Sequence, residues 1–220
     1  MSYKIKICGL STLDQINMAK SFGADMIGFI FASPSPREIT PSYAKNLSFL
    51  SAAKDLERVA VFVEPDNKFL QEAVHSIDAN LIQLHGNETP GRCLEIKSLT
   101  GLPIIKSIGV SNIMDIKGAQ QYINHVDYFL FDAKPSIDDK SQKGGLNKVF
   151  DWSLLKEWTG PKYILSGGLN IKNVEDAIKM TNAVVIDVSS GVESEPGIKN
   201  EEMIKNFIDT TKSAFGKRDE

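Results

Sequence analysis

The feature of this sequence that most constrains its fold is an eightfold alternation of short apolar segments with amphipathic ones. The apolar segments are rich in β-branched residues and predict strands at 4–8, 26–31, 58–63, 81–85, 103–108, 128–131, 163–166 and 183–188. The amphipathic segments predict helices at 12–22, 41–52, 67–76, 90–99, 112–122, 152–158, 171–180 and 201–215. Strands that are each followed by a helix pair in parallel, through right-handed crossovers.

Eight such units in 220 residues predict an α/β fold, a single (β/α)8 TIM barrel of eight parallel strands surrounded by helices, as one catalytic domain over 1–220. A doubly wound open sheet is the alternative. It typically uses fewer strands, and no Gly-x-Gly-x-x-Gly fingerprint follows a strand here. The closed barrel is therefore the favoured prediction.

The composition bears on the partners of the chain. A net charge of −3 provides no general attraction for nucleic acid or for an anionic membrane, so we expect neither as a partner. The longest apolar segment, 24–32, is too short to cross a bilayer, and the amino terminus does not resemble a signal peptide. The two cysteines, Cys8 and Cys93, cannot form a disulfide framework, which favours a reducing compartment. We therefore expect a cytoplasmic chain.

Two residues that can transfer protons stand at the carboxyl ends of predicted strands. Cys8 ends the first strand and precedes Gly9, and Asp132 follows four apolar residues of the sixth strand. Barrel enzymes collect their catalytic groups at this edge, and an acid and a base there could act on two faces of one substrate. The alternatives are a buried core thiol for Cys8 and a helix cap or a loop salt bridge for Asp132. No helix is predicted soon after Asp132, which weakens the capping alternative.

The ends of the seventh and eighth strands predict a phosphate site. Ser-Gly-Gly-Leu ends the seventh strand and contains Gly167 and Gly168, and Asp-Val-Ser-Ser-Gly-Val-Glu ends the eighth and contains Ser189, Ser190 and Gly191. Many barrels bind phosphate with these two loops, through free backbone N–H groups and hydroxyls. The alternative is that the glycines only ease the turns.

Two further side chains are candidates for the substrate pocket. Arg37 follows Ser-Pro-Ser-Pro in a long loop and could grip a carboxylate or a phosphate, or could be a solvated surface residue. His85 ends the fourth strand and could line the pocket or belong to the core. A nucleophile–base pair of Cys8 with His85 is conceivable, although nothing indicates acyl transfer. No His, Cys or Asp cluster has metal-ligand spacing, so we predict no metal.

The chain resembles the phosphoribosylanthranilate isomerases of tryptophan biosynthesis over nearly its whole length. The segments that carry the resemblance, in this order, are Lys-Ile-Cys-Gly-Leu from position 6, Gly-Ala-Asp-Met-Ile-Gly-Phe-Ile-Phe from 23, Ser-Pro-Ser-Pro-Arg from 33, Val-Phe-Val from 61, Gln-Leu-His-Gly from 83, Phe-Asp-Ala-Lys from 131, Phe-Asp-Trp from 150, Ser-Gly-Gly-Leu from 166 and Asp-Val-Ser-Ser-Gly-Val-Glu from 187.

The resemblance implies a cofactor-free Amadori rearrangement of N-(5-phosphoribosyl)anthranilate to the 1-deoxyribulose-phosphate derivative. Asp132 would be the general acid and Cys8, as a thiolate, the general base. Arg37 would hold the anthranilate carboxylate, Asp187 would contact the sugar or the amine, and His85 would line the pocket. The loops after the seventh and eighth strands would bind the phosphate. Monomeric and dimeric barrels share this sequence pattern, so we expect either a monomer or a homodimer.

One departure from the family concerns the predicted lid loop after the sixth strand. The family usually has Gly-Gly-Thr-Gly there, where this chain has Leu146 and Asn147 in the last two positions. We expect altered lid contacts with the activity retained. The alternatives to the isomerase are another phosphosugar barrel, such as indole-glycerol-phosphate synthase or a ribulose-phosphate epimerase, and a barrel that only binds a phosphate ligand.

Overall fold

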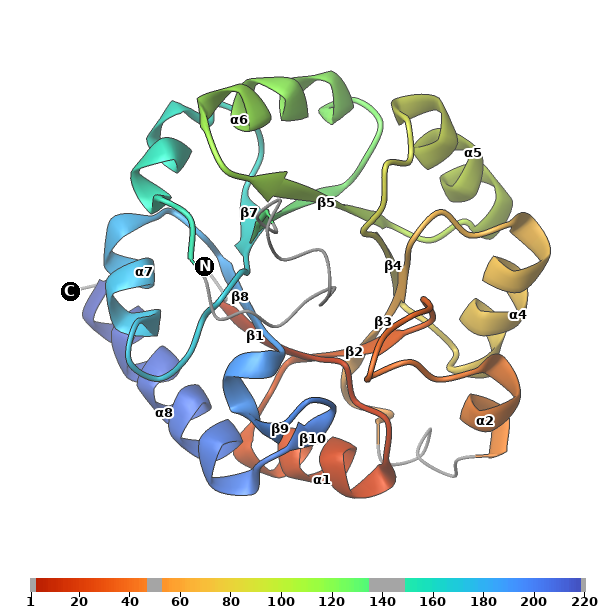
Figure 1. Cartoon of the computed structure of the whole chain (residues 1–220), viewed down its shortest axis with the longest axis horizontal. Helices are drawn as coiled ribbons and strands as arrows, with labels where there is room; N and C mark the ends of the chain where they lie inside the picture. The colour runs from red at the N-terminus through yellow and green to blue at the C-terminus, as the bar shows by residue number, and fades with distance from the viewer. Residues whose placement is uncertain (1–2, 47–52, 135–148, 219–220) are drawn as a thin grey trace.

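Eight strands pair in chain order around a closed barrel in the computed structural model, which describes residues 3–46, 53–134 and 149–218 (Figure 1). The strands are β1 (Lys4–Cys8), β2 (Met26–Ile30), β3 (Glu57–Phe62), β4 (Leu81–Leu84), β5 (Ile104–Val110), β6 (Tyr128–Ala133), β7 (Tyr163–Leu165) and β8 (Val185–Val188). Every neighbouring pair is parallel, and β8 pairs with β1 to close the ring. The predicted (β/α)8 barrel is confirmed.

Helices surround the barrel, one layer outside the strands (Figure 1). The α-helices are α1 (Leu13–Phe22), α2 (Pro41–Asn46), α4 (Asn67–Ser76), α5 (Pro90–Thr100), α6 (Ile113–Ala119), α7 (Val174–Met180) and α8 (Glu201–Arg218). Short 3-10 helices are η1 (Gln120–Tyr122), η3 (Trp152–Glu157) and η4 (Ser190–Val192). None of the helices described is long and apolar enough to span a membrane.

Three predicted helices differ from the observed ones, and residues 47–52 of the helix predicted at 41–52 lie outside the described residues. Trp152–Glu157 is a 3-10 helix, and the side chain of its N-cap residue Asp151 accepts a hydrogen bond from the Ser153 N–H. The helix predicted from 171 begins at Val174, because the side chains of Asn170 and Asn173 bond backbone N–H groups in the preceding turn.

The third difference is at the last helix, which continues past 215 to Arg218. The guanidinium of Arg218 donates to the carbonyls of Thr181 and Ala183 and lies 4.5 Å from the centroid of the Tyr3 ring. These contacts hold the last helical turn against the barrel.

A two-stranded hairpin after β8 was not predicted. It consists of β9 (Glu193–Glu195) and β10 (Ile198–Lys199), which pair antiparallel. Strands of three and two residues are too short to show an alternating pattern, so the sequence carried no strand signal there.

Alternate residues of each strand point into the barrel and out toward the helices. On β1, Ile5 and Ile7 join the large core beneath the helices, whereas Cys8 belongs to a separate core inside the barrel. That inner core is lined by Cys8, Met26, Val59, Val61, Leu81, Ile105, Leu130, Ile164 and Val185. A Lys at position 6 and an Asp at position 187 extend it with polar groups, since each lies two residues from a member of this core.

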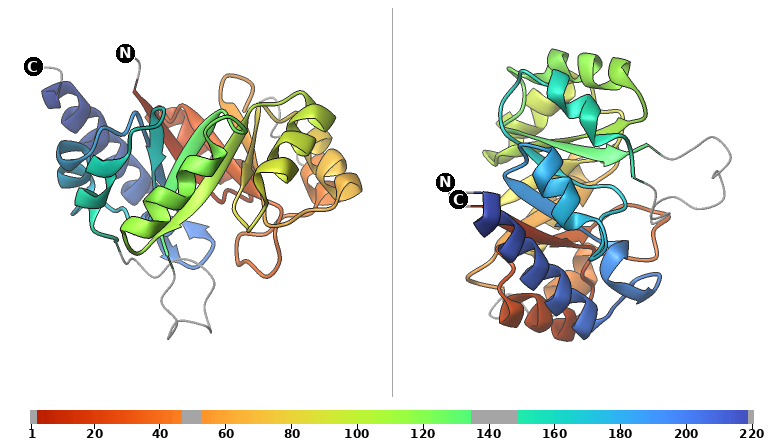
Figure 2. Two further views of the ribbon diagram at one scale, coloured as in Figure 1. Left: turned by 90° about the horizontal axis from the view of Figure 1, so that it is seen from above. Right: turned by 90° about the vertical axis from the view of Figure 1, so that its left-hand side faces the viewer.

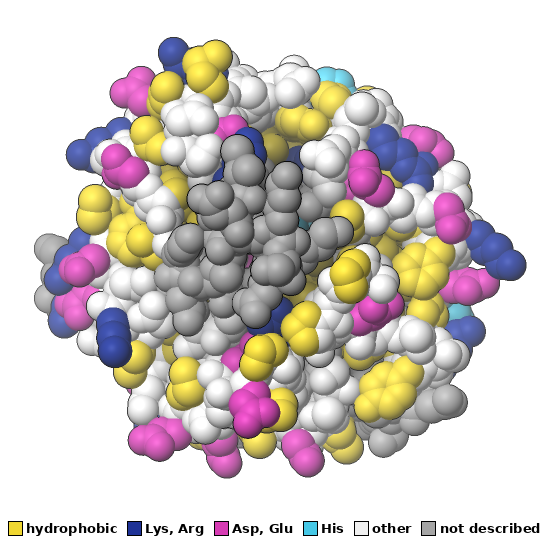
Figure 3. Space-filling view, viewed as in Figure 1, with side chains coloured by type: hydrophobic (Ala, Val, Ile, Leu, Met, Phe, Trp, Pro, Cys, Tyr) yellow, Lys and Arg dark blue, Asp and Glu magenta, His cyan; other side chains and the backbone are white. Residues whose placement is uncertain are grey.

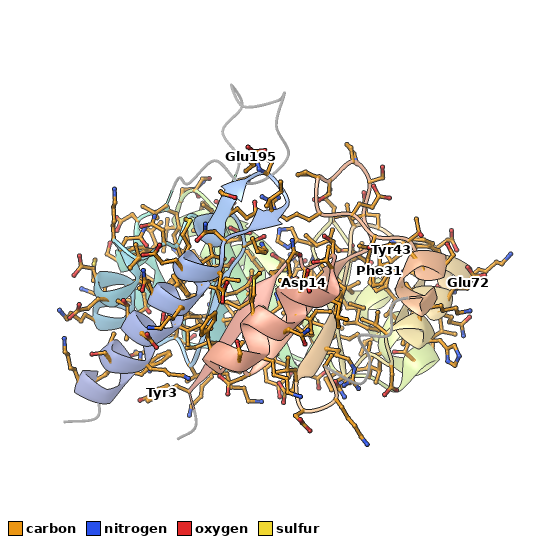
Figure 4. All side chains as sticks on the ribbon, turned by 90° about the horizontal axis from the view of Figure 1, so that it is seen from below. Tyr3, Asp14, Phe31, Tyr43, Glu72 and Glu195 are labelled. Carbon is orange, nitrogen blue, oxygen red and sulfur yellow. The ribbon has the colours of Figure 1, made fainter. Side chains whose placement is uncertain are left out.

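The carboxyl ends of the strands open at the end of the barrel opposite the chain termini. The loop after β2 and the β9–β10 hairpin project from this end (Figure 2), which we call the mouth. Figure 4 shows Glu195 of the hairpin at the mouth and Tyr3, just before β1, at the opposite end. On the mouth face, acidic and basic side chains are interspersed around the rim (Figure 3).

Candidate active site

Cys8 is the last residue of β1 and lies beside Gly28 of β2, its partner in the strand register. The thiol is buried, with 5% of the residue exposed, and it stands at the strand end that the sequence predicted. A Cβ on Gly28 would come within 2.7 Å of Sγ, so the absent side chain provides the space that the thiol occupies. Burial raises the pKa of the Cys8 thiol, although the charges of Lys6 and Lys199 act in the opposite direction.

A buried ion pair lies next to the thiol. Lys6 and Asp187 are partners in the register of β1 and β8, and Lys6 Nζ is 2.9 Å from Asp187 Oδ1. The other carboxylate oxygen, Oδ2, accepts a hydrogen bond of 3.2 Å from the Ser166 hydroxyl at the end of β7. Burial alone would lower the pKa of Lys6, but the charges and hydrogen bonds of Asp187 and Cys8 together raise it, so the ammonium stays charged.

Asp132 and His85 lie next to each other at the mouth. His85 Nε2 is 3.4 Å from Asp132 Oδ2, and both side chains are partly exposed. Gln83 Nε2 lies 3.0 Å from His85 Nδ1; an amide N–H donating there leaves the ring proton on Nε2, the nitrogen toward Asp132. Asp132 itself lies within β6 rather than after it. His85 is thus a residue of the mouth and not of the core.

Arg37 is buried, with 6% exposed, and is not the solvated surface residue considered as its alternative. Its Nε and Nη2 donate to the two carboxylate oxygens of Glu193 at 2.7 and 2.6 Å. Lys199 Nζ lies 2.6 Å from Glu193 Oε1, so one carboxylate serves two cations. Burial favours the neutral acid, yet the bonds and charges of Arg37 and Lys199 hold the pKa of Glu193 below its usual value.

The two loops predicted to bind phosphate lie against each other. A Cβ on Gly191 would collide with the backbone carbonyl of Leu169, which follows Gly168. Gly167 has φ +87, and a Cβ there would come within 2.7 Å of Asp132 Oδ1, so this glycine also gives the carboxylate its room. The Ser189 hydroxyl donates to the Cys8 carbonyl at 3.0 Å. Ser190 begins η4 at the mouth.

Sequence reasoning missed Lys6, Gln83, Glu193 and Lys199. Lys6 and Gln83 carried a usable signal, because each is a polar residue flanked by apolar residues at an inward position of a strand. Glu193 and Lys199 had none, since only the hairpin brings them to Arg37. Leu146 and Asn147 lie outside the described residues.

The structure offers no obvious metal centre in 3–46, 53–134 and 149–218, where no group of three or more His, Cys, Asp and Glu side chains could hold an ion. The absence of a metal and of a cofactor stays a prediction. Both cysteines are free and buried.

Comparison with known proteins agrees with this arrangement. The family model described as N-(5'phosphoribosyl)anthranilate (PRA) isomerase matches residues 5–210. The chain belongs to this family. An N-(5'-phosphoribosyl)anthranilate isomerase of Rhizobium meliloti (strain 1021) is 43% identical over 215 residues, covering 97% of this chain and 99% of the relative.

Solved structures of the isomerase family superpose on the barrel. A phosphoribosyl anthranilate isomerase in complex with reduced 1-(o-carboxyphenylamino)-1-deoxyribulose 5-phosphate has a TM-score of 0.82 and 33% identity, over 97% of this chain and 100% of that one. Monomers of the dimeric isomerase from Thermotoga maritima give a TM-score of 0.82 and 34% identity over the same shares. The resemblance to the phosphoribosylanthranilate isomerases of tryptophan biosynthesis is confirmed, and the chain is an enzyme of that family.

Proposed function

We propose that the chain carries out the Amadori rearrangement of N-(5-phosphoribosyl)anthranilate with Asp132 as the general acid and Cys8 as the general base. The observation that carries this assignment is the placement of both groups at the mouth, on strands β1 and β6 that are separated by β7 and β8. An acid and a base from different sides of the barrel can act on two atoms of one substrate.

In this mechanism the Asp132 carboxyl gives its proton to the ribose ring oxygen, and the ring opens to a protonated Schiff base. Cys8, as a thiolate, then removes the proton from C2′ and leaves an enolamine, which tautomerises to the ketone. Because burial raises the pKa of the Cys8 thiol, thiolate formation needs added positive charge. The cationic Schiff base provides some of that charge when the base is required.

We assign the remaining predicted substrate contacts to particular groups. Glu193 holds Nε and Nη2 of Arg37, so Nη1 is the nitrogen that we assign to the anthranilate carboxylate. The phosphate would sit on the backbone N–H groups of Gly167, Gly168, Ser190 and Gly191 with the Ser189 turn beside them. His85 would line the pocket above Asp132, and Asp187 would act on the sugar or amine from its place between Lys6 and Ser166.

Five properties remain predictions: a monomeric or homodimeric state, a cofactor-free reaction, a single domain over 1–220, no nucleic acid partner and a cytoplasmic location. For the oligomeric state, the isomerase from Thermotoga maritima is a precedent, since it is dimeric and also has a monomeric form.

The test is the decay of phosphoribosylanthranilate fluorescence after the purified protein is added to substrate generated in place. Cys8→Ser and Asp132→Asn should each fold and lose about 10²- to 10⁴-fold in turnover, the usual contribution of one acid or base. Cys93→Ser makes the same chemical change at a buried thiol of α5 and should keep its turnover.

Near-native turnover by Cys8→Ser or Asp132→Asn would refute the corresponding role. No decay above the spontaneous rate from well-folded parent protein would instead point to another phosphosugar reaction or to a barrel that only binds its ligand.

A further inference from the structure

A lysine is fully buried inside the barrel, and the acid–base mechanism above gives it no role. Lys6 has 0% exposure, and an ammonium in such surroundings is strongly unfavourable unless it is paired and hydrogen-bonded. A hydrophobic residue would fill the same volume without that cost. Packing alone therefore does not explain why this position carries a charged residue.

The lysine and the catalytic thiol share one side of β1. Lys6 and Cys8 are two residues apart in a strand, so both side chains point into the barrel. A Cβ built on Gly28 would lie 2.7 Å from Cys8 Sγ and 3.3 Å from Lys6 Nζ, which places the thiol and the ammonium around one point. Asp187 holds Nζ there from β8 at 2.9 Å.

Among the described residues, the charged groups that act most strongly on Cys8 come from three strands. Lys6 of β1 and Lys199 of β10 favour the thiolate, and Asp187 of β8 opposes it. On β2 the neighbours are Gly28 and Met26, which carry no charge. Lys199 also bonds Glu193 and the Ser189 carbonyl, so its charge is shared more widely than that of Lys6.

We propose that Lys6 is a positioning residue for the reaction: its ammonium, held in place by Asp187, is the fixed cation beside which Cys8 becomes a thiolate. The thiol proton passes to a solvent water molecule, and Lys6 remains protonated throughout. Asp187 thereby has two opposed effects, since it anchors the cation and partly cancels its charge. The catalytic meaning of this inference rests on Cys8 being the base, as proposed above.

The test follows the ionisation of Cys8 directly, by carbon-13 NMR of protein labelled at the cysteine Cβ. The chain has two cysteines, and Cys8→Ser assigns the two signals. Lys6→Met combined with Asp187→Asn removes both charges and leaves neither unpaired. Because Lys6 acts on Cys8 more strongly than Asp187 does, the double variant should have a higher pKa of Cys8 than the parent, with an acid dissociation constant reduced by about tenfold.

Comparing the parent with the double variant avoids both single variants, in each of which an unpaired charge would stay buried and could prevent folding. Cys93 is an internal control, because its pKa is raised to about 11 by burial and its charged neighbours are Lys106, Glu88 and Arg92. Its titration should be the same in the parent and in the double variant, and circular dichroism should show that both are folded.

Equal Cys8 titrations in the parent and in the double variant would overturn the proposal, and so would a lower pKa of Cys8 in the double variant. Neither result depends on turnover. Near-native turnover by Cys8→Ser would overturn the assignment of the base while leaving the NMR result to stand on its own.

Discussion

Two glycines shape the space around the two proton-transfer groups. Gly28 faces Cys8 across the β1–β2 pair, and Gly167, at a positive φ of +87, faces Asp132. Side chains at these positions would push directly on Sγ and on Oδ1. The missing side chains of the two glycines are therefore as important to the site as the reactive groups, because a close-packed interior has no free volume into which the thiol could shift.

Gly28→Ala is therefore expected to destabilise the protein by about 1–3 kcal/mol, the usual cost of adding atoms to a packed interior. Turnover should also fall, since the new methyl group would displace the Cys8 thiol. Urea unfolding and the fluorescence assay measure the two effects.

Gly118→Ala is the matched control. Gly118 lies in α6, and a Cβ there meets nothing within 4 Å. Because glycine weakens a helix interior, this change should stabilise the protein by about 0.5–1 kcal/mol and leave turnover unchanged. A Gly28→Ala protein as stable and as active as the parent would contradict the close-packing argument.

The β9–β10 hairpin is held together by charge rather than by strand length. Glu193 accepts from Arg37 and Lys199, and also from the Gly197 N–H at 3.2 Å. Gly197, at φ +86, forms the turn between the strands. The hairpin thereby connects the loop after β2 to the loop after β8, and it fixes the orientation of the Arg37 guanidinium.

Glu193→Gln should destabilise the protein by about 3–5 kcal/mol at neutral pH, because it leaves two buried cations without their counterion. The effect should shrink in acid. The folded-state pKa of Glu193 lies below its usual 4.5, so its contribution is complete above that pH and is lost as the pH falls through the folded value. Urea unfolding of parent and variant at several pH values down to about pH 3.5 tests both statements.

Glu195→Gln makes the same change in the same hairpin at an exposed position, labelled in Figure 4. It should alter stability by less than about 0.5 kcal/mol at any pH. A constant difference between the parent and Glu193→Gln across the acid range would show that the carboxylate charge is not the source of the effect.

The whole molecule is closed by contacts between its two ends. β1 pairs with β8, the rings of Tyr3 and Phe215 stack at 4.3 Å, and Arg218 lies over the Tyr3 ring. Figure 2 shows the termini together at the end of the barrel away from the mouth. The site at the mouth is thus remote from the chain ends, and the barrel depends on contacts between residues far apart in sequence.

A circular permutant that joins the old termini with a glycine-rich linker and opens the chain after Gly101 should fold and keep its turnover. Gly101 ends α5, at the side away from the mouth, and a Cβ there would meet nothing within 4 Å. The fluorescence assay and circular dichroism measure the outcome.

A permutant opened after Gly168 is the contrasting case, because the break falls in the proposed phosphate site. It should keep the barrel but lose most turnover. Equal turnover by both permutants would argue against a phosphate site at that loop.

Fold and site differed in how far they could be predicted. The eight strands and most helix positions were predicted because an apolar strand or an amphipathic helix is a local pattern. The errors at Trp152–Glu157 and at Val174 arose where side-chain caps altered the local hydrogen bonding. Cys8, Asp132 and His85 were placed at the mouth because each stands at or near a strand end.

By itself, the sequence determined three things: the barrel fold, the edge of the barrel that carries the candidate catalytic residues, and the family. All three depend on the order of short segments along the chain. The tertiary structure alone decided that Cys8 is buried, that Lys6 meets Asp187 and that Arg37 is held by Glu193. The physical reason is separation: Lys6 and Asp187 are 181 positions apart, and Arg37 and Glu193 are 156 apart. Only the closure of β1 against β8, and the folding of the hairpin over it, bring such charges within hydrogen-bonding distance.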